Sequence, residues 1–142
     1  MANTVIQMKS GSDNAYPVST SKRVLLWTNP DPGSLAETTI YCDMEGCDEV
    51  EIECTNTGNP DGEVYYVREK LGTDTIGRQT YLTSVFLNTN LSGLNSIGIM
   101  TRIARCYLHG IWFSSGMQIY DGTLYTGWNN RAVPYRVWGI HY

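Results

Sequence analysis

Charge is scarce in this sequence. Asp, Glu, Lys and Arg make up 17% of its 142 residues, whereas about 25% is usual in globular proteins. The net charge is −4, and the ten Lys and Arg residues are scattered along the chain. We therefore expect no nucleic-acid partner, because nucleic-acid binding needs clustered cations.

Long hydrophobic runs are absent as well. No apolar run approaches the ~20 residues of a membrane-spanning helix, so we expect no membrane insertion. Residues 1–5 lack the basic region and apolar core of a secretory signal. We therefore expect assembly in a cytosol, where cysteines stay reduced. The cysteines are Cys42, Cys47, Cys54 and Cys106.

Groups for nucleophilic catalysis are few. The only histidines are His109, which precedes Gly110 in a turn-like position, and His141, which is next to the last residue. No Gly-x-Ser-x-Gly motif is present, and no two carboxylates stand out as an acid–base pair across a cleft. We predict no catalytic residues and no enzymatic activity.

Metal-binding spacing is also missing. Four residues separate Cys42 from Cys47 and six separate Cys47 from Cys54, so there is no Cys-x-x-Cys pair. The acidic residues nearby do not follow the pattern of a calcium-binding loop, and we interpret them as a solvated face. These are Asp43, Glu45, Asp48 and Glu49. We predict no metal and no cofactor.

Short strand patterns are what the sequence does contain. Residues 23–28 form an apolar run that stops at the turn-forming residues 29–33, and residues 135–140 repeat this pattern at the far end. Residues 49–54 alternate strictly, with Val50, Ile52 and Cys54 facing inward. The same alternation directs Glu49, Glu51 and Glu53 to water.

One segment, residues 97–108, fits two patterns. Helical spacing would group Met100, Ile103, Ala104 and Leu108, whereas strand spacing would group every second residue from Ile97. Its flanks are turn-like and its neighbours, such as residues 79–87, are strand-like, so we predict a strand. Several short strands at hairpin spacing predict an all-β fold, an antiparallel, jelly-roll-like β-sandwich over residues 22–142.

Residues 1–21 are mostly polar and cannot bury a core. Five residues carry the apolar side chains that could attach this segment to something else: Val5, Ile6, Met8, Tyr16 and Val18. The segment is either a frayed terminus or an extended arm that becomes ordered by adding a strand to a neighbouring protein.

Aromatic residues gather in the last third of the chain, beside amide and charged side chains. The candidate contact residues are Trp112, Tyr120, Tyr125, Trp128, Asn129 and Arg131. Aromatic rings with polar neighbours can bind a sugar ring. Ordinary packing in the core and turns gives the same pattern, and so does a subunit contact, because aromatics and Arg are enriched at interfaces.

Several segments are similar to those of a known family. Residues 25–32 read Leu-Leu-Trp-Thr-Asn-Pro-Asp-Pro and precede an Ala-x-Thr-x-Ile strand that starts at Ala36. Together with residues 48–52 and 132–140, they resemble a β-sandwich module of tailed-phage virion proteins. The start of the chain, residues 1–9, is similar to that of many phage fibre and head-appendage proteins. The likeness to the sandwich module covers residues 22–142 and carries no catalytic residues.

The resemblance implies a bacteriophage virion structural protein, either a head fibre, a capsid decoration protein or a tail fibre, assembled in the host bacterial cytoplasm. Its partners would be other virion proteins of the capsid, neck or tail, and proteins of this class are commonly homotrimers. The chain has no stalk or heptad run, which favours a small protein docked on the particle surface. The alternative is a host-recognition (receptor-binding) module that binds a host surface glycan.

Overall fold

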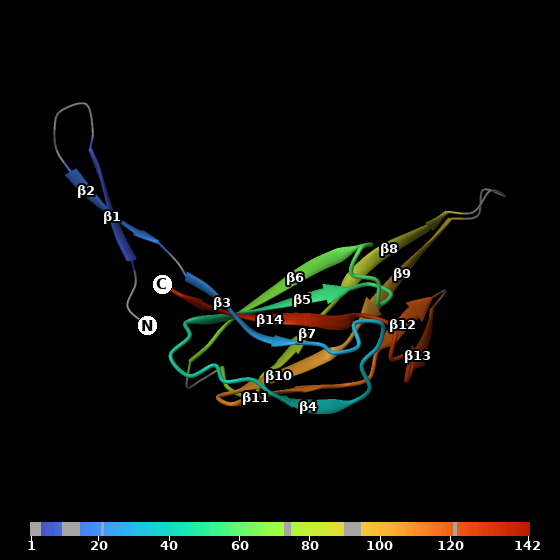
Figure 1. Cartoon of the computed structure of the whole chain (residues 1–142). Helices are drawn as coiled ribbons and strands as arrows, with labels where there is room; N and C mark the ends of the chain where they lie inside the picture. Colours follow the sequence, from blue (N-terminus) through green and yellow to red (C-terminus); the bar gives the residue numbers. More distant parts are fainter. Residues whose placement is uncertain (1–3, 10–14, 21, 73–74, 90–94, 121) are drawn as a thin grey trace.

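The structure is a computed structural model that describes the backbone of residues 4–9, 15–20, 22–72, 75–89, 95–120 and 122–142, and side chains within 22–72, 75–85, 98–120 and 122–142. The described residues form strands and no helix, and therefore none that could cross a membrane. All strand pairs are antiparallel. The predicted all-β fold is confirmed (Figure 1).

The strands of the described residues are numbered in chain order. They are β1 (Thr4–Lys9), β2 (Ala15–Thr20), β3 (Lys22–Thr28), β4 (Thr38–Tyr41), β5 (Glu49–Thr55), β6 (Val64–Lys70), β7 (Gln79–Tyr81), β8 (Ser84–Thr89), β9 (Asn95–Thr101), β10 (Ile103–Tyr107), β11 (Gly110–Phe113), β12 (Met117–Tyr120), β13 (Thr123–Thr126) and β14 (Val133–His141).

Three four-stranded sheets build residues 22–142. We call β3-β14-β5-β6 the ion-pair sheet, β4-β11-β10-β7 the core sheet and β13-β12-β9-β8 the neutral sheet. The ion-pair sheet lies over the core sheet, and together they form the sandwich (Figure 1). Strands β3 and β14, predicted from the two ends of this region, pair with each other in the ion-pair sheet.

The hydrophobic core lies between the ion-pair sheet and the core sheet. Its buried members come from both sheets and from the connections beside them: Ile40, Cys42, Met44, Val50, Ile52, Cys54, Leu82, Ala104, Cys106, Ile111, Phe113 and Val137. The inward orientation predicted for Val50, Ile52 and Cys54 is confirmed. Alternation along a strand fixed it, because successive side chains point to opposite faces of a sheet.

The prediction that Glu51 and Glu53 face water is wrong. Only 8% of Glu51 and 3% of Glu53 are exposed, although both lie on the side of β5 opposite to the core. Arg136 and Trp138 of the neighbouring strand β14 donate hydrogen bonds to the Glu53 carboxylate and help to cover it. Burial of a carboxylate is tolerated when its oxygens are paired in this way.

The neutral sheet continues the core sheet along the same chain segments. Strands β7 and β8, β9 and β10, and β11 and β12 follow one another with short breaks, so that the sheet changes direction. Strand structure is confirmed for residues 97–107 except at Arg102, where a break divides them, and Leu108 lies in a turn. The expected strand 79–87 is divided at residues 82–83 into β7 and β8, and β8 continues to Thr89.

The Asn-Pro-Asp-Pro-Gly motif after β3 connects this turn to β14, far along the chain. Asn29 is buried; its backbone N–H donates to Tyr135 O at 2.8 Å, and its Nδ2 donates to Pro134 O at 2.9 Å. Its Oδ1 accepts the N–H of Asp31, and the Asp31 carboxylate accepts the N–H of Gly33. The Asn-Pro-Asp-Pro-Gly sequence therefore joins the start of the sandwich to β14.

Strands β1 and β2 form a two-stranded sheet of their own, outside the three sheets of the sandwich (Figure 1). Within the arm expected over residues 1–21, the described backbone therefore pairs with itself. Ile6 pairs with Val18, and Met8 pairs with Tyr16.

Candidate functional site

A buried arginine organises the junction between the sheets. Arg102 lies in the break between β9 and β10 and is completely buried. Its Nε, Nη1 and Nη2 atoms donate to five backbone carbonyls and to no carboxylate. The acceptors are Ala132 at 2.9 Å, Leu35 at 2.6 Å, Ser114 at 2.7 Å, Asn129 at 3.0 Å and Arg131 at 3.1 Å.

The hydrogen bonds of Arg102 use every donor that a guanidinium has. Burial lowers the pKa of Arg102 to about 10, so the side chain stays charged at neutral pH. Ala132, one of its acceptors, adopts the left-handed region with φ 49°, which is uncommon for a residue with a Cβ. One signal of this site was a charged arginine within an apolar segment, and the sequence-based predictions missed it.

Part of the predicted aromatic group does come together. Tyr125 and Trp128 stack with ring centroids 5.0 Å apart, and the Arg131 guanidinium lies 5.3 Å from the Trp128 ring centroid. Arg131 Nε also donates to Gln118 Oε1 at 2.7 Å. We call Gln118, Tyr125, Trp128 and Arg131 the aromatic patch. It lies at the end of the molecule that carries β12 and β13.

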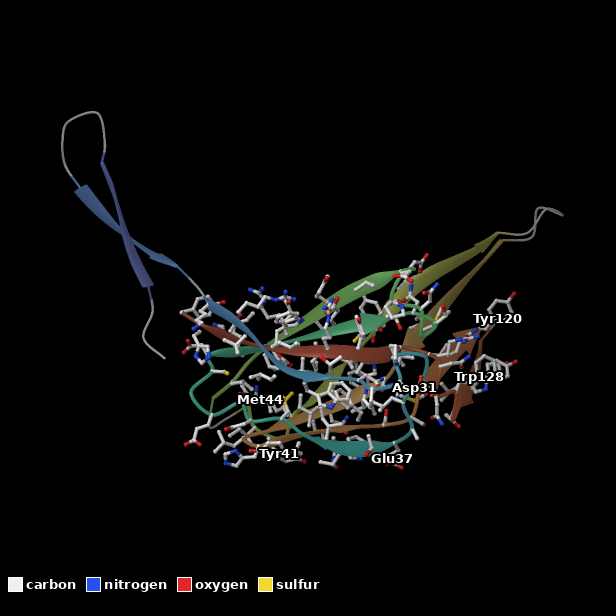
Figure 2. All side chains as sticks on the ribbon, in the orientation of Figure 1. Asp31, Glu37, Tyr41, Met44, Tyr120 and Trp128 are labelled. Carbon is white, nitrogen blue, oxygen red and sulfur yellow. The ribbon has the colours of Figure 1, made fainter. Side chains whose placement is uncertain are left out.

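The remaining candidate residues occupy different positions. Tyr120 follows Gln118 by two residues in β12, so it lies on the same side of the strand and near Trp128 (Figure 2). Asn129 lies beside the patch, and its carbonyl is bound by Arg102. Trp112 lies in the core sheet, where the Arg105 guanidinium is 5.2 Å from its ring centroid.

The five residues predicted to anchor the chain lie in β1 and β2. Their side chains are outside the described part of the structure. Their backbone positions are described, and four of the five occupy the paired positions given above.

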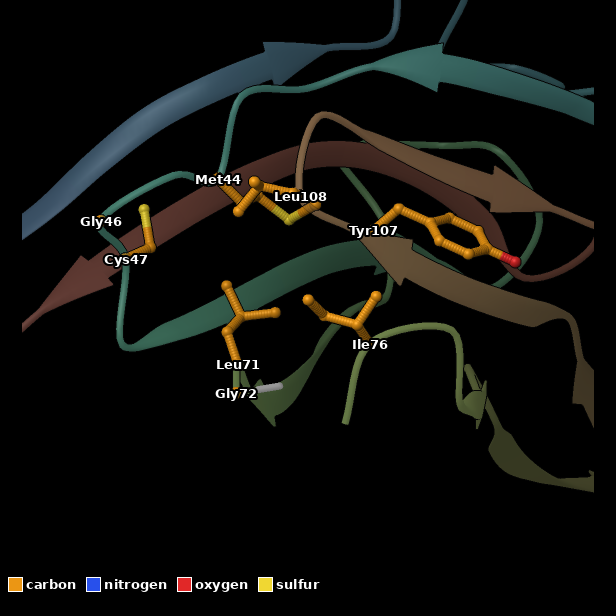
Figure 3. A pocket seen from close by; sticks show the side chains of 8 residues that line it. All are labelled: Met44, Gly46, Cys47, Leu71, Gly72, Ile76, Tyr107 and Leu108. Carbon is orange, nitrogen blue, oxygen red and sulfur yellow. The ribbon is translucent and has the colours of Figure 1, made fainter. Parts of the chain in front are cut away.

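A cysteine and a histidine meet beside an apolar pocket that sequence analysis did not predict. Cys47 Sγ is 3.6 Å from His141 Nε2, and His141 Nδ1 is 2.9 Å from Gly46 O. Because a carbonyl only accepts, Nδ1 carries the proton of the neutral ring, and Nε2 can accept from the thiol. The pocket has a volume of about 210 Å³ and is lined mainly by apolar side chains, among them Met44, Leu71 and Ile76 (Figure 3).

The electrostatics of this pair do not favour a thiolate. Burial raises the pKa of Cys47, and the carboxylates of Asp43 and Asp48 raise it further. A reactive cysteine needs the opposite environment, with positive charge nearby. His141, expected to be poorly placed because it is next to the end of the sequence, is in fact buried within β14. The pair resembles a nucleophile and its base in geometry but lacks the activation.

Three exposed side chains could approach a cation together. The ligand atoms of Asp43, Glu45 and His109 lie within 4.8 Å of one another, and His109 Nδ1 is 3.1 Å from Asp43 Oδ1. Asp43 Oδ1 also accepts the backbone N–H of Glu45. All three are exposed, so water competes for any ion, and the group has the character of the solvated acidic face that was predicted.

The described side chains therefore offer one stacked aromatic patch, one apolar pocket and one buried structural arginine. Comparison of the chain with protein-family models, with curated proteins and with solved structures gives no match.

Proposed function

We propose that this protein is a non-enzymatic structural component of a tailed-phage virion. In this proposal it is a small fibre or decoration protein attached to the capsid, neck or tail. Residues 1–21 attach it to the particle, and residues 22–142 project as a β-sandwich. Three copies form the mature appendage.

The observation that carries this proposal is the separation of the β1–β2 hairpin from the sandwich. The hairpin pairs with no strand of the three large sheets, and an isolated two-stranded hairpin is only marginally stable in water. A partner protein would supply the missing contacts. By contrast, residues 22–142 have their own core and the Arg102 junction, so they can fold without that partner.

The resemblance in residues 22–142 supports the same function, because its motif residues have structural roles. Asn29 and Asp31 hold the turn after β3 against β14. The non-enzymatic part of the proposal is supported by the Cys47–His141 pair, in which burial and nearby carboxylates disfavour the thiolate.

Deletion of residues 2–21 tests the attachment. The truncated protein is expected to unfold at the temperature of the full chain and to be missing from assembled particles. A more specific test replaces Ile6 and Val18 with Lys. The matched control replaces Gln7 with Lys, because Gln7 pairs with Pro17 at the intervening position of the hairpin. Full occupancy of particles by the truncated protein would contradict the attachment role.

A second candidate function is recognition of a host surface glycan by the aromatic patch. The Tyr125–Trp128 stack, with the Arg131 guanidinium against Trp128, supports this alternative. A glycan array would test it with Trp128→Ala as the variant. Trp112→Ala is the control, because Trp112 lies in the core sheet beside Arg105. Specific binding that only Trp128→Ala removes would favour recognition.

A further inference from the structure

The neutral sheet carries a row of aliphatic side chains across all four of its strands. Leu124 pairs with Ile119, Ile119 pairs with Ile99, and Ile99 pairs with Val85. Residues paired directly across strands lie on the same face, so these four share one face, which we call the aliphatic face. Val85 is 66% exposed, Leu124 is 56% exposed and Ile119 is 37% exposed.

The opposite face of the neutral sheet is covered at its centre. Its row consists of Tyr125, Gln118, Met100 and Ser84, which pair in that order. Met100 is buried, Gln118 accepts a hydrogen bond from Arg131, and Ser84 donates one to Asn56. A sheet normally buries its more apolar face against another layer. Here Met100 is buried and Gln118 is partly buried in the middle of the polar row, whereas Tyr125 at its β13 end is 38% exposed. The aliphatic row has no covering layer among the described residues.

Charge is absent from the neutral sheet. Strands β8, β9, β12 and β13 contain no Asp, Glu, Lys or Arg. Around a symmetry axis, identical residues of different copies come close to one another. A charged residue there would be repelled by the same charge on the other copy. A neutral aliphatic face avoids this repulsion, and its burial costs no desolvation of ions.

We infer that copies of this chain associate through the aliphatic face, with the row of one copy turned toward the rows of the others around a shared axis. The occupant of the face is thus a second copy, which brings a surface of the same chemistry. This inference deepens the proposed function by naming the assembly surface, and it rests on that proposal for the number of copies only.

The area of the aliphatic face determines how tightly we expect the copies to associate. Four strands about 4.8 Å apart, each four to seven residues long with a rise of ~3.3 Å per residue, make a face of roughly 250–440 Å². This area is smaller than the ~800 Å² that each partner buries in a standard interface. We therefore expect association that depends on concentration. Both edge strands, β8 and β13, are available to enlarge the contact, since neither has an outer neighbour in its sheet.

Sedimentation velocity of the full chain, from about 1 to about 100 μM, tests the inference across the range of weak specific interfaces. The wild type is expected to show a mass above the monomer that rises with concentration. Leu124→Glu and Val85→Glu, both at exposed positions, are expected to sediment as folded monomers. Thr123→Glu is the matched control, because Thr123 is exposed and pairs with Tyr120 on the opposite face.

A monomeric wild type at every concentration would overturn the inference, and so would an assembly that both Glu variants leave unchanged. These outcomes are independent of particle attachment. The variant without residues 2–21 keeps the neutral sheet, so it should still assemble even if it no longer joins the particle. Loss of attachment and loss of assembly therefore report on the proposed function and on this face separately.

Discussion

The ion-pair sheet and the neutral sheet are both four-stranded and antiparallel, yet their outward faces differ in chemistry. On the ion-pair sheet, Glu53 accepts from Arg136 Nε at 2.6 Å and from Trp138 Nε1 at 3.2 Å. Glu51 accepts from Arg23 at 2.7 Å, and the Arg23 guanidinium lies 3.8 Å from the Trp138 ring centroid.

The outward face of the ion-pair sheet is covered by its own chain, whereas the outward face of the neutral sheet is not covered by the described residues. In the ion-pair sheet, charged and aromatic side chains satisfy one another, so the face is complete in the single chain. In the neutral sheet, the exposed side chains Leu124 and Val85 have no such covering layer among the described residues. The first sheet should therefore respond to mutation through folding, and the second through assembly.

The largest effect is expected at Arg102, which joins the two regions. Arg102→Met leaves five carbonyls without their donor, and we expect a loss of about 4 kcal/mol or more in the free energy of unfolding. Urea unfolding would measure it. The matched control is Arg105→Met, three residues along, where a loss below about 1 kcal/mol is expected. Equal losses for both variants would contradict the role assigned to Arg102.

Removal of a charge from the ion-pair sheet should have the next largest effect. Glu53→Ala leaves Arg136 and Trp138 without their shared acceptor, and a loss of about 3 kcal/mol is expected. Glu37→Ala is the control, because Glu37 is exposed in the connection before β4 (Figure 2), and a change within about 0.5 kcal/mol is expected there. Thermal unfolding of both variants would decide whether the ion-pair sheet depends on this carboxylate.

The same sheet predicts a dependence on pH. Burial raises the pKa of Glu53, but hydrogen bonds from Arg136, Trp138 and Tyr66 outweigh it and hold the pKa below its usual range. A carboxyl with a lowered pKa in the folded state stabilises the fold above its unfolded pKa of about 4.3. This stabilisation is lost as the pH falls below that value through the folded pKa. Urea unfolding from pH 7 to pH 2 should show the decline, and Glu53→Gln should reduce it.

The smallest effect on folding is expected in the neutral sheet. Leu124→Glu adds a charge at an exposed position, so the free energy of unfolding of the monomer should change by about 0.5 kcal/mol or less. Chemical unfolding at low protein concentration, where assembly is negligible, would measure it. A loss above about 2 kcal/mol would mean that Leu124 packs within its own chain, and the contrast between the two sheets would fail.

Local patterns predicted the fold well. The alternation in residues 49–54 was enough to direct Val50 and Ile52 inward, because that period belongs to a single strand. Burial of Glu53 was not predictable in the same way, since its partner Arg136 lies 83 residues away. Which distant residues meet is decided by the pairing of β5 with β14, and a single sequence does not reveal that pairing.

The candidate sites likewise were predictable where the residues are close in sequence and not where they come from distant segments. Tyr125 and Trp128 are close in the sequence and stack in the structure, joined by the turn at Gly127 with φ 76°. Trp112 is also near them in sequence, but its strand belongs to the core sheet. Arg102 was visible as a charge among apolar residues, but its carbonyl acceptors come from several segments and could not be predicted.

Solvent accessibility of the aliphatic face is the measurement that tests this account most directly. Methyl NMR of the full chain with a soluble paramagnetic probe would report on Val85, Ile119 and Leu124 at low and high protein concentration. These methyl signals should be broadened by the probe when the chain is dilute and protected when it is concentrated, and Leu124→Glu should remove the protection. Equal broadening of the wild-type signals at every concentration would contradict the account.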